Sequence, residues 1–194
     1  MPSEYATFGL APAMRAGGAL TDGDRHPRRG FVDFVVDGRP LLLRLSGLDA
    51  VSPLASDVPP AIFAAQVRGL LLEAAAPLDG GRYVIYGCPE CESVECGAVT
   101  ALVERDGDDY VWRDFAWQTG ERADLERNGY HGTGPFRFRG PEYRRALNSL
   151  LGGAPRTGRH RIPPEAGDVR EGSFAVARTP GSALAEPVTH RRAR

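Results

Sequence analysis

The sequence contains no lysine, and all 24 of its basic residues are arginine. This absence excludes sites that depend on a lysine amine, such as the phosphate-binding loop G-x-x-x-x-G-K-[ST] and enzymes that form a Schiff base. The nucleophile elbow G-x-S-x-G, the metalloprotease motif H-E-x-x-H, the EF-hand loop and a dinucleotide-binding G-x-G-x-x-G after a strand are also missing. The sequence therefore favours a protein without catalytic activity.

Long apolar runs are missing too. No stretch approaches the roughly 18 consecutive apolar residues of a transmembrane helix. The first residues contain the acid Glu4, in place of the basic start and the apolar run of roughly 7 to 15 residues that mark a secretory signal. We therefore expect a cytoplasmic protein with no membrane contact.

Cysteine is scarce, and all three cysteines, Cys88, Cys91 and Cys96, fall within nine residues. A chain of 194 residues is long enough to bury a core without disulfides. An odd number of closely spaced cysteines in a cytoplasmic protein indicates metal ligands or free thiols.

Composition divides the chain into three parts. Residues 1–30 hold five glycines and three prolines, which predicts an irregular N-terminal arm. Residues 31–151 contain the apolar periodicity of a single domain. Residues 152–194 hold six glycines, five prolines and many arginines without an apolar stripe, which predicts a disordered tail.

The middle part predicts an α+β domain: an antiparallel sheet with two hairpins, one helix packed on a face and a closing C-terminal helix. Asp37-Gly38 suits the tight turn of a first hairpin over residues 31–45, with Asp33 lying near Arg44 on its partly exposed face. The helix of about 16 residues begins near Pro60, and its apolar residues would cover the sheet. Strands are expected at 82–86, 98–104, 110–117 and 135–138, and the closing helix at 140–151.

The cysteine loop offers the densest chemistry. Cys88-x2-Cys91 has the spacing of half a zinc site, because two thiolates in a tight turn can reach one tetrahedral ion. Cys96 could supply a third sulfur if Gly97 lets the backbone fold back, and His131 is the first candidate for a fourth ligand. Redox-active thiols, a catalytic zinc with an open position and simple packing of small side chains are the alternatives.

Charge is unevenly distributed although the net charge is −1. Residues 79–126 hold twelve acidic residues and four arginines, whereas residues 127–194 hold thirteen arginines and five acidic residues. A pI of about 6.4 disfavours nucleic-acid binding, so we expect the charged ends to meet another protein. Asp114 is the one acid placed among strand aromatics, and those aromatics would form a binding patch if exposed.

Residues 83–117, with C-P-E-C-x4-C-G-A-V-T followed by V-W-R-D-F-x-W, resemble an uncharacterised family of small actinobacterial proteins. Residues 135–151 are similar to the closing strand and helix of that family. The resemblance implies a domain boundary and no activity.

These observations predict a non-catalytic binding or interaction module with a structural zinc ion at Cys88, Cys91 and Cys96. Two alternatives stay open. One is a thiol-redox or zinc-dependent enzyme that uses the same cysteines. The other is nucleic-acid binding through the arginine-rich tail.

Overall fold

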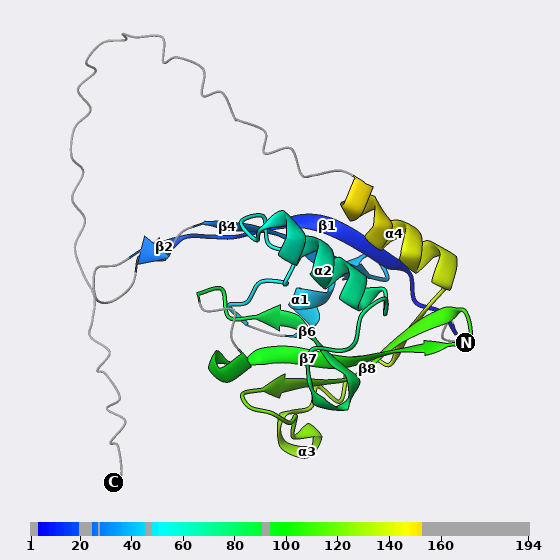
Figure 1. Cartoon of the computed structure of the whole chain (residues 1–194). Coiled ribbons are helices and arrows are strands. Elements are labelled where there is room, and N and C mark those ends of the chain that lie inside the picture. Colours follow the sequence, from blue (N-terminus) through cyan, green and yellow to red (C-terminus); the bar gives the residue numbers. More distant parts are fainter. Residues whose placement is uncertain (1–3, 20–24, 27, 46–47, 91–93, 153–194) are drawn as a thin grey trace, which may run out of the picture. The chain divides into compact units, whose positions relative to one another are not determined.

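The computed structural model describes residues 4–19, 25–26, 28–45, 48–90 and 94–152 (Figure 1). This part of the chain has the predicted α+β fold, with antiparallel sheets in the orders β1-β4-β5, β2-β3 and β6-β7-β8-β9. The strands are β1 (Phe8–Arg15), β2 (Gly18–Ala19), β3 (Arg25–His26), β4 (Arg29–Val36), β5 (Arg39–Pro40), β6 (Arg82–Gly87), β7 (Ala98–Asp106), β8 (Asp109–Gln118) and β9 (Phe136–Phe138). The helices are α1 (Leu41–Arg44), α2 (Pro60–Leu70), α3 (Leu125–Asn128) and α4 (Gly140–Gly152), with single 3-10 turns η1 (Asp79–Gly81) and η2 (Val94–Cys96).

Strand β1 lies within the segment predicted to be an irregular arm. It pairs with β4 over its whole length, from Phe8 opposite Val36 to Arg15 opposite Arg29. Pro12 is tolerated because β1 is an edge strand, where a missing N–H need not interrupt the ladder. The expected tail lies outside the described residues, except for Gly152 at the end of α4.

The first hairpin is shorter than predicted. Asp37 and Gly38 form its turn with positive φ angles of 51° and 71°, but only two residue pairs join β4 to β5. The leucine-rich segment that follows forms α1 and not a strand. Leucine favours helices, and the four-residue spacing of Leu41 and Leu45 buries both side chains. Leu43, on the same short helix, is 76% exposed.

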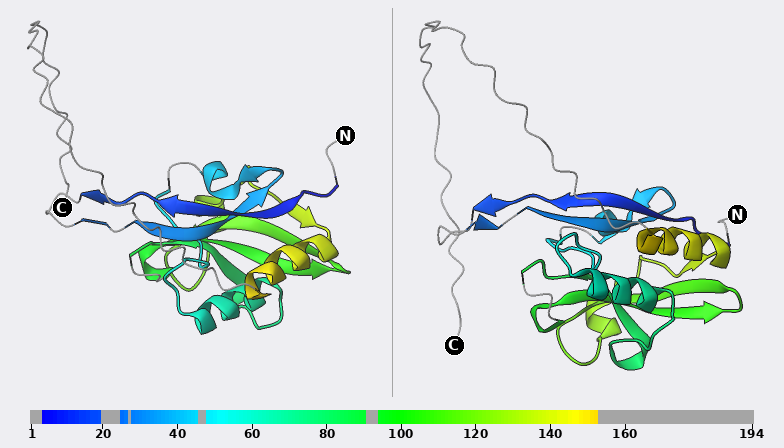
Figure 2. Two further views of the ribbon diagram at one scale, coloured as in Figure 1. Left: turned by 90° about the horizontal axis from the view of Figure 1, so that it is seen from above. Right: turned by 45° about the horizontal axis from the view of Figure 1, so that its top comes forward.

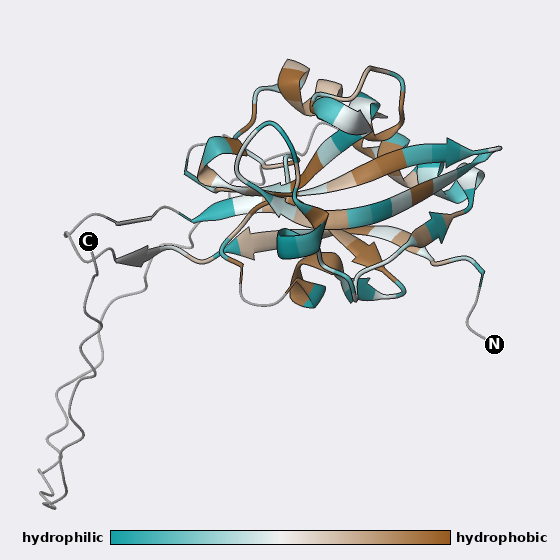
Figure 3. Cartoon of the chain, turned by 90° about the horizontal axis from the view of Figure 1, so that it is seen from below, coloured by the Kyte–Doolittle hydropathy of each residue, from teal (hydrophilic) through white to brown (hydrophobic). Residues whose placement is uncertain are grey.

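The second sheet matches the prediction closely. Strands β6, β7, β8 and β9 follow one another in space as in sequence. Figure 3 shows that the strands of the molecule carry both hydrophobic and hydrophilic stretches. Helix α2 ends at Leu70 instead of continuing for about 16 residues, and Leu72 has a positive φ angle of 59°. None of the helices in the described residues combines the length and apolarity needed to cross a membrane.

An aromatic cluster joins the two larger sheets. The rings of Phe34 on β4 and Trp112 on β8 pack edge to face with centroids 5.1 Å apart. Trp112 also donates a hydrogen bond of 3.0 Å to the hydroxyl of Tyr143 on α4, which in turn donates to the carbonyl of Leu70 at the end of α2. Figure 2 shows the β1–β4 ribbon facing the four-stranded sheet, with α2 and α4 along the same side. The aromatic residues of β6 and β8 are therefore mostly core. Trp117 is half-buried and the others are buried, namely Tyr83, Tyr86, Tyr110, Trp112 and Phe115.

Residues 48–58 connect the sheets through backbone hydrogen bonds. Val51 exchanges two hydrogen bonds, of 3.1 and 2.9 Å, with Gly87 at the end of β6. On the other side, Val32 of β4 donates to the carbonyl of Leu54, and the hydroxyl of Ser52 donates to the carbonyl of Val32. This connection fixes the end of β6, where the cysteine loop begins.

Asp33 is buried between the sheets and does not face Arg44 as predicted. The hydroxyl of Tyr86 on β6 donates a hydrogen bond to its carboxylate. Burial raises the pKa of Asp33, and hydrogen bonds from Tyr86 and from the backbone N–H groups of Phe34 and Leu42 partly oppose that change. Arg44 instead donates to the carbonyl of Val36 and lies over the ring of Phe136.

Tyr86→Phe removes the side-chain hydrogen bond that Asp33 accepts within the described residues and leaves a buried carboxyl group short of a partner. We expect the free energy of unfolding to fall by about 1–3 kcal/mol in chemical denaturation. Tyr83→Phe makes the same chemical change where the hydroxyl bond to Ala74 is longer, at 3.3 Å, and only partly buried. Its loss should be clearly smaller, and equal losses would contradict this role of the Asp33–Tyr86 bond.

The pH dependence of stability tests the burial of Asp33 separately. Because its pKa is raised in the folded protein, its contribution to stability is complete at low pH and is lost as the pH rises above its ordinary value of 3.8. Asp33→Asn keeps an acceptor for Tyr86 but cannot ionise. The stability of the wild type relative to Asp33→Asn should therefore decrease from about pH 4 to about pH 8 in urea unfolding. A constant difference across that range would contradict the prediction.

Candidate functional site

The cysteine loop connects β6 to β7 and is closed by Gly97. This glycine has a φ angle of +104°, and a Cβ atom on it would lie only 2.0 Å from the Trp117 ring. No other residue type fits there, so Gly97 does allow the sharp return that the sequence suggested. Cys88 directly follows β6 and is half-buried, whereas Cys96 ends η2 and is exposed. Cys91 lies outside the described residues.

Two arginines at the far end of the β1–β4 ribbon hold the start of this loop. Arg29 donates to the carbonyl of Pro89 at 2.6 Å and to the carboxylate of Asp57 at 2.9 Å. Arg15 donates to Glu90 at 2.8 Å and makes two further hydrogen bonds to Asp49. The hydrogen bonds to Asp49 are the largest cause of the raised pKa of Arg15. Both arginine side chains are about nine-tenths buried, so their hydrogen bonds hold the start of the loop against the β1–β4 ribbon.

Cys88 lies in the wall of an apolar groove beside α2. The groove consists of two depressions of about 190 and 460 Å³ that share Val58. We call it the α2 groove. The first depression is lined by Val51, Ser52, Pro53, Val58, Ile62, Gln66, Pro77, Leu78, Val84, Gly87, Cys88 and Val94. The second is lined by Ala55, Ser56, Asp57, Val58, Pro59, Pro60, Phe63, Ala64, Leu150 and Leu151.

The exposed apolar side chains mark this groove as a surface of interest. Ile62 is 50% exposed in the first depression and Leu151 is 37% exposed in the second. Sequence periodicity placed Ile62 and Phe63 against the sheet, because their spacing matches one helix face. In the structure α2 buries Val67 and Leu70 near its C-terminal end, and its N-terminal half stands partly uncovered.

His131 lies in a different cavity from Cys88. It lines a space of about 310 Å³ together with Asp114, whereas Cys88 lines the first depression of the α2 groove. In the part of the chain that the structure describes, no group of three or more His, Cys, Asp and Glu side chains is placed to hold a metal ion. With Cys91 outside this part, the zinc site at Cys88, Cys91, Cys96 and His131 stays a prediction.

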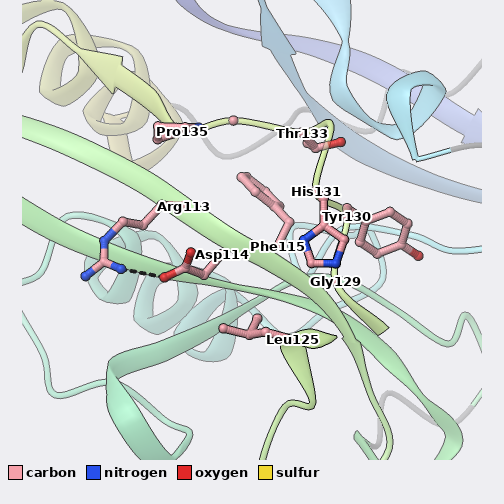
Figure 4. Close-up of a pocket in the computed structure, with 10 residues that line it drawn as sticks. Arg113, Asp114, Phe115, Leu125, Gly129, Tyr130, His131, Thr133 and Pro135 are labelled. Carbon is pink, nitrogen blue, oxygen red and sulfur yellow. Dashed lines mark hydrogen bonds and ion pairs between the residues drawn. The ribbon is translucent and has the colours of Figure 1, made fainter. Parts of the chain in front are cut away.

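The cavity around His131 forms where β8 bulges, and we call it the bulge pocket (Figure 4). The register between β7 and β8 shifts between Thr100 and Leu102, and opposite this point Asp114 has a positive φ angle of 55°. Such backbone in a non-glycine residue is uncommon and is often found at functional sites. The walls comprise Arg113, Asp114, Phe115, Leu125, Gly129, Tyr130, His131, Thr133, Gly134 and Pro135.

Buried Arg82 holds this bulge from the core side. Its guanidinium donates to the carbonyl of Asp114 at 2.7 Å and to both the hydroxyl and the carbonyl of Thr100 at 2.9 Å. Burial lowers the pKa of Arg82, and the Asp114 charge opposes that change. The hydroxyl of Thr100 in turn donates a hydrogen bond of 2.9 Å to the side-chain oxygen of Gln118. The bulge is therefore a fixed feature with its own buried support.

Metal analysis of the purified chain tests the predicted zinc site. We expect one zinc ion per chain, its loss in Cys88→Ser, and a fall in the free energy of unfolding of about 2.7 kcal/mol on chelation if free zinc stands at one hundred times its Kd. Absence of zinc from the wild type, or an unchanged zinc content in Cys88→Ser, would contradict the prediction.

The variant His131→Ala tests whether His131 is the fourth ligand of the predicted zinc ion. Loss of zinc from this variant would assign His131 to the metal, and full retention would remove it from the ligand set. His131 is exposed, so its replacement should leave the fold intact.

Comparisons of the chain with protein-family models, with curated proteins and with solved structures found no match. The resemblance to a family of small actinobacterial proteins accordingly stays a prediction.

Proposed function

We propose that this chain is a non-catalytic binding module that binds a partner protein in the α2 groove. The bound segment of the partner is apolar and has basic residues on either side of it. The observation that carries the proposal is a pair of neighbouring depressions that share Val58 and that each contain a partly exposed apolar side chain, Ile62 in one and Leu151 in the other. Contiguous exposed apolar surface rimmed by polar residues is typical of protein interaction sites.

The apolar lining supplies the favourable free energy. Fully burying an isoleucine or leucine side chain contributes roughly 1.5–3 kcal/mol, so covering the exposed half of Ile62 contributes about 1 kcal/mol. Phe63, Val58 and Leu150 are only partly buried and pack against the core from the same region. A partner segment with two or three large apolar side chains could cover them together.

Charge favours basic residues on the partner. Asp57 is the one charged residue among those that line the two depressions, and the lining contains no arginine. At the rim, Glu90 is an exposed acid two residues after Cys88, which lines the first depression. Residues 79–126, which include the cysteine loop, hold twelve acidic residues against four arginines. Lysine or arginine beside the apolar segment would complement this rim.

Anchoring of the loop lowers the cost of binding. Arg29 binds Asp57, which lines the second depression, and Pro89, which follows Cys88 of the first depression, so both walls are held before a partner arrives. Order present in the free protein need not be created on association. The zinc ion predicted at Cys88, Cys91 and Cys96 would stiffen the same wall. The location proposed with this function is the cytoplasm, where closely spaced thiols stay reduced.

Binding of a synthetic peptide tests the proposal. The probe is a fluorescent amphipathic peptide of about 16 residues, or about four helical turns, with leucine on one face and lysine on the other. We expect saturable binding in fluorescence anisotropy, and protection of Cys88 from alkylation as located by mass spectrometry. Ile62→Glu should weaken binding about tenfold or more, because it places a charge in the apolar groove.

Leu43→Glu is the matched control, since Leu43 is an exposed apolar residue on α1 that does not line the groove. It should bind the peptide like the wild type. A version of the peptide with glutamate in place of lysine should bind poorly. Equal weakening by both substitutions, or equal binding of the acidic peptide, would overturn the proposal.

A further inference from the structure

We infer that the bulge pocket is a second binding site, for a small organic cation that carries an ammonium group on an aromatic or short alkyl body. No step of the proposed partner docking uses this pocket, because the two cavities of the α2 groove share no lining residue with it. Its volume of about 310 Å³ lies at the lower end of the roughly 300–1,000 Å³ found for small-molecule sites, which suits a compact ligand.

Part of the pocket surface is apolar and aromatic. Phe115 is 1% exposed and forms part of the wall, with Leu125 and Pro135 beside it. Figure 4 shows the Phe115 ring between Asp114 on one side and His131 on the other. Removing an apolar ring or chain from water into such a space is favourable. The body of the ligand is therefore expected to lie against Phe115 and Leu125.

One carboxylate gives the pocket its charge preference. One oxygen of Asp114, Oδ2, accepts a hydrogen bond from Arg113, and Oδ1 accepts none within the described residues. Arg113 also binds Glu104 through both oxygens of that carboxylate, at 2.7 and 3.2 Å. The charge of Arg113 is thus shared between two carboxylates, and the buried Arg82, the other cation near Asp114, bonds to its backbone carbonyl and leaves Oδ1 open. An ammonium group beside Asp114 Oδ1 would donate a charge-assisted hydrogen bond to it.

The pocket is formed before any ligand binds. Arg82 fixes the carbonyl of Asp114 from the core, and the N–H of Tyr130 donates to the carbonyl of Phe115 at 2.7 Å. The N–H of Thr133 donates to the carbonyl of Tyr130, which holds the turn that carries His131. Burial raises the pKa of Tyr130, so its phenol stays neutral at physiological pH. These bonds keep the acid and the apolar wall in a fixed relation.

Three probes with nearly the same body separate charge from apolar contact. Phenethylamine carries the ammonium group, 2-phenylethanol is its neutral counterpart, and 3-phenylpropanoate is anionic. We would titrate each into the full-length protein and follow amide chemical shifts by NMR. Phenethylamine should shift amides of residues 113–115 and 129–134 and bind about tenfold or more tightly than the alcohol, while the anion should cause no shift there.

Asp114→Asn is the decisive variant, because asparagine tolerates positive φ and so preserves the bulge while removing the charge. It should reduce phenethylamine binding to the level of the alcohol. Asp108→Asn, an exposed acid in the β7–β8 turn that does not line the pocket, should bind like the wild type. Equal affinity for all three probes, unchanged binding by Asp114→Asn, or shifts confined to residues outside the pocket would overturn the inference.

Discussion

Phe34 and Trp112 meet with ring centroids 5.1 Å apart, and the relative placement of the two larger sheets depends on this contact. Because β5 pairs with β4 at only two positions, the first sheet is close to a two-stranded ribbon, which would be marginal alone. Sharing one aromatic core stabilises both sheets. Tyr143 brings α4 into the same cluster and, through its bond to Leu70, fixes the end of α2. The uncovered half of α2 is a consequence, because the helix is held from its C-terminal end.

The same packing places the β1–β4 ribbon so that its far end meets the cysteine loop. There Arg15 and Arg29 each bind two residues, and Arg82 does the same beneath the bulge of β8. The planar guanidinium suits such divided bonding, since it presents several donors in a fixed fork, whereas a lysine ammonium is a compact point charge. The arginine-only composition thus has a structural use at three covered positions, whatever its origin.

Local patterns predicted what local forces decide. Strands β6 to β9 and helix α4 were predicted at nearly their observed bounds, because alternation, turn residues and glycine stops lie within each segment. The prediction was wrong for residues 41–45, where helix propensity prevails over the strand suggested by the Asp-Gly turn. It also missed β1, whose pairing with β4 joins residues that are 14 positions apart at Arg15 and Arg29 and 28 apart at Phe8 and Val36. Burial of Asp33 depends on Tyr86, which sequence could not place beside it.

For the candidate sites too, the sequence predicted residue types but not how the fold brings them together. Sequence singled out Cys88, Asp114 and His131 by residue type, and the structure brings Asp114 and His131 to one pocket and leaves Cys88 in another groove. No sequence signal marks the α2 groove, because the periodicity of Ile62 and Phe63 is the same whether a sheet or a partner covers them. The bulge at Asp114 is likewise hidden, since only pairing with β7 reveals a residue out of register. Both sites arise from contacts between distant segments.

Hydrogen–deuterium exchange of the full-length protein, with and without the basic amphipathic peptide, tests most directly whether the α2 groove is a binding site. Our account predicts slower exchange in the N-terminal half of α2, at residues 87–90 and at the C-terminal end of α4, with residues 129–135 unchanged. Protection confined to other segments, or none at peptide concentrations that saturate the anisotropy signal, would contradict it.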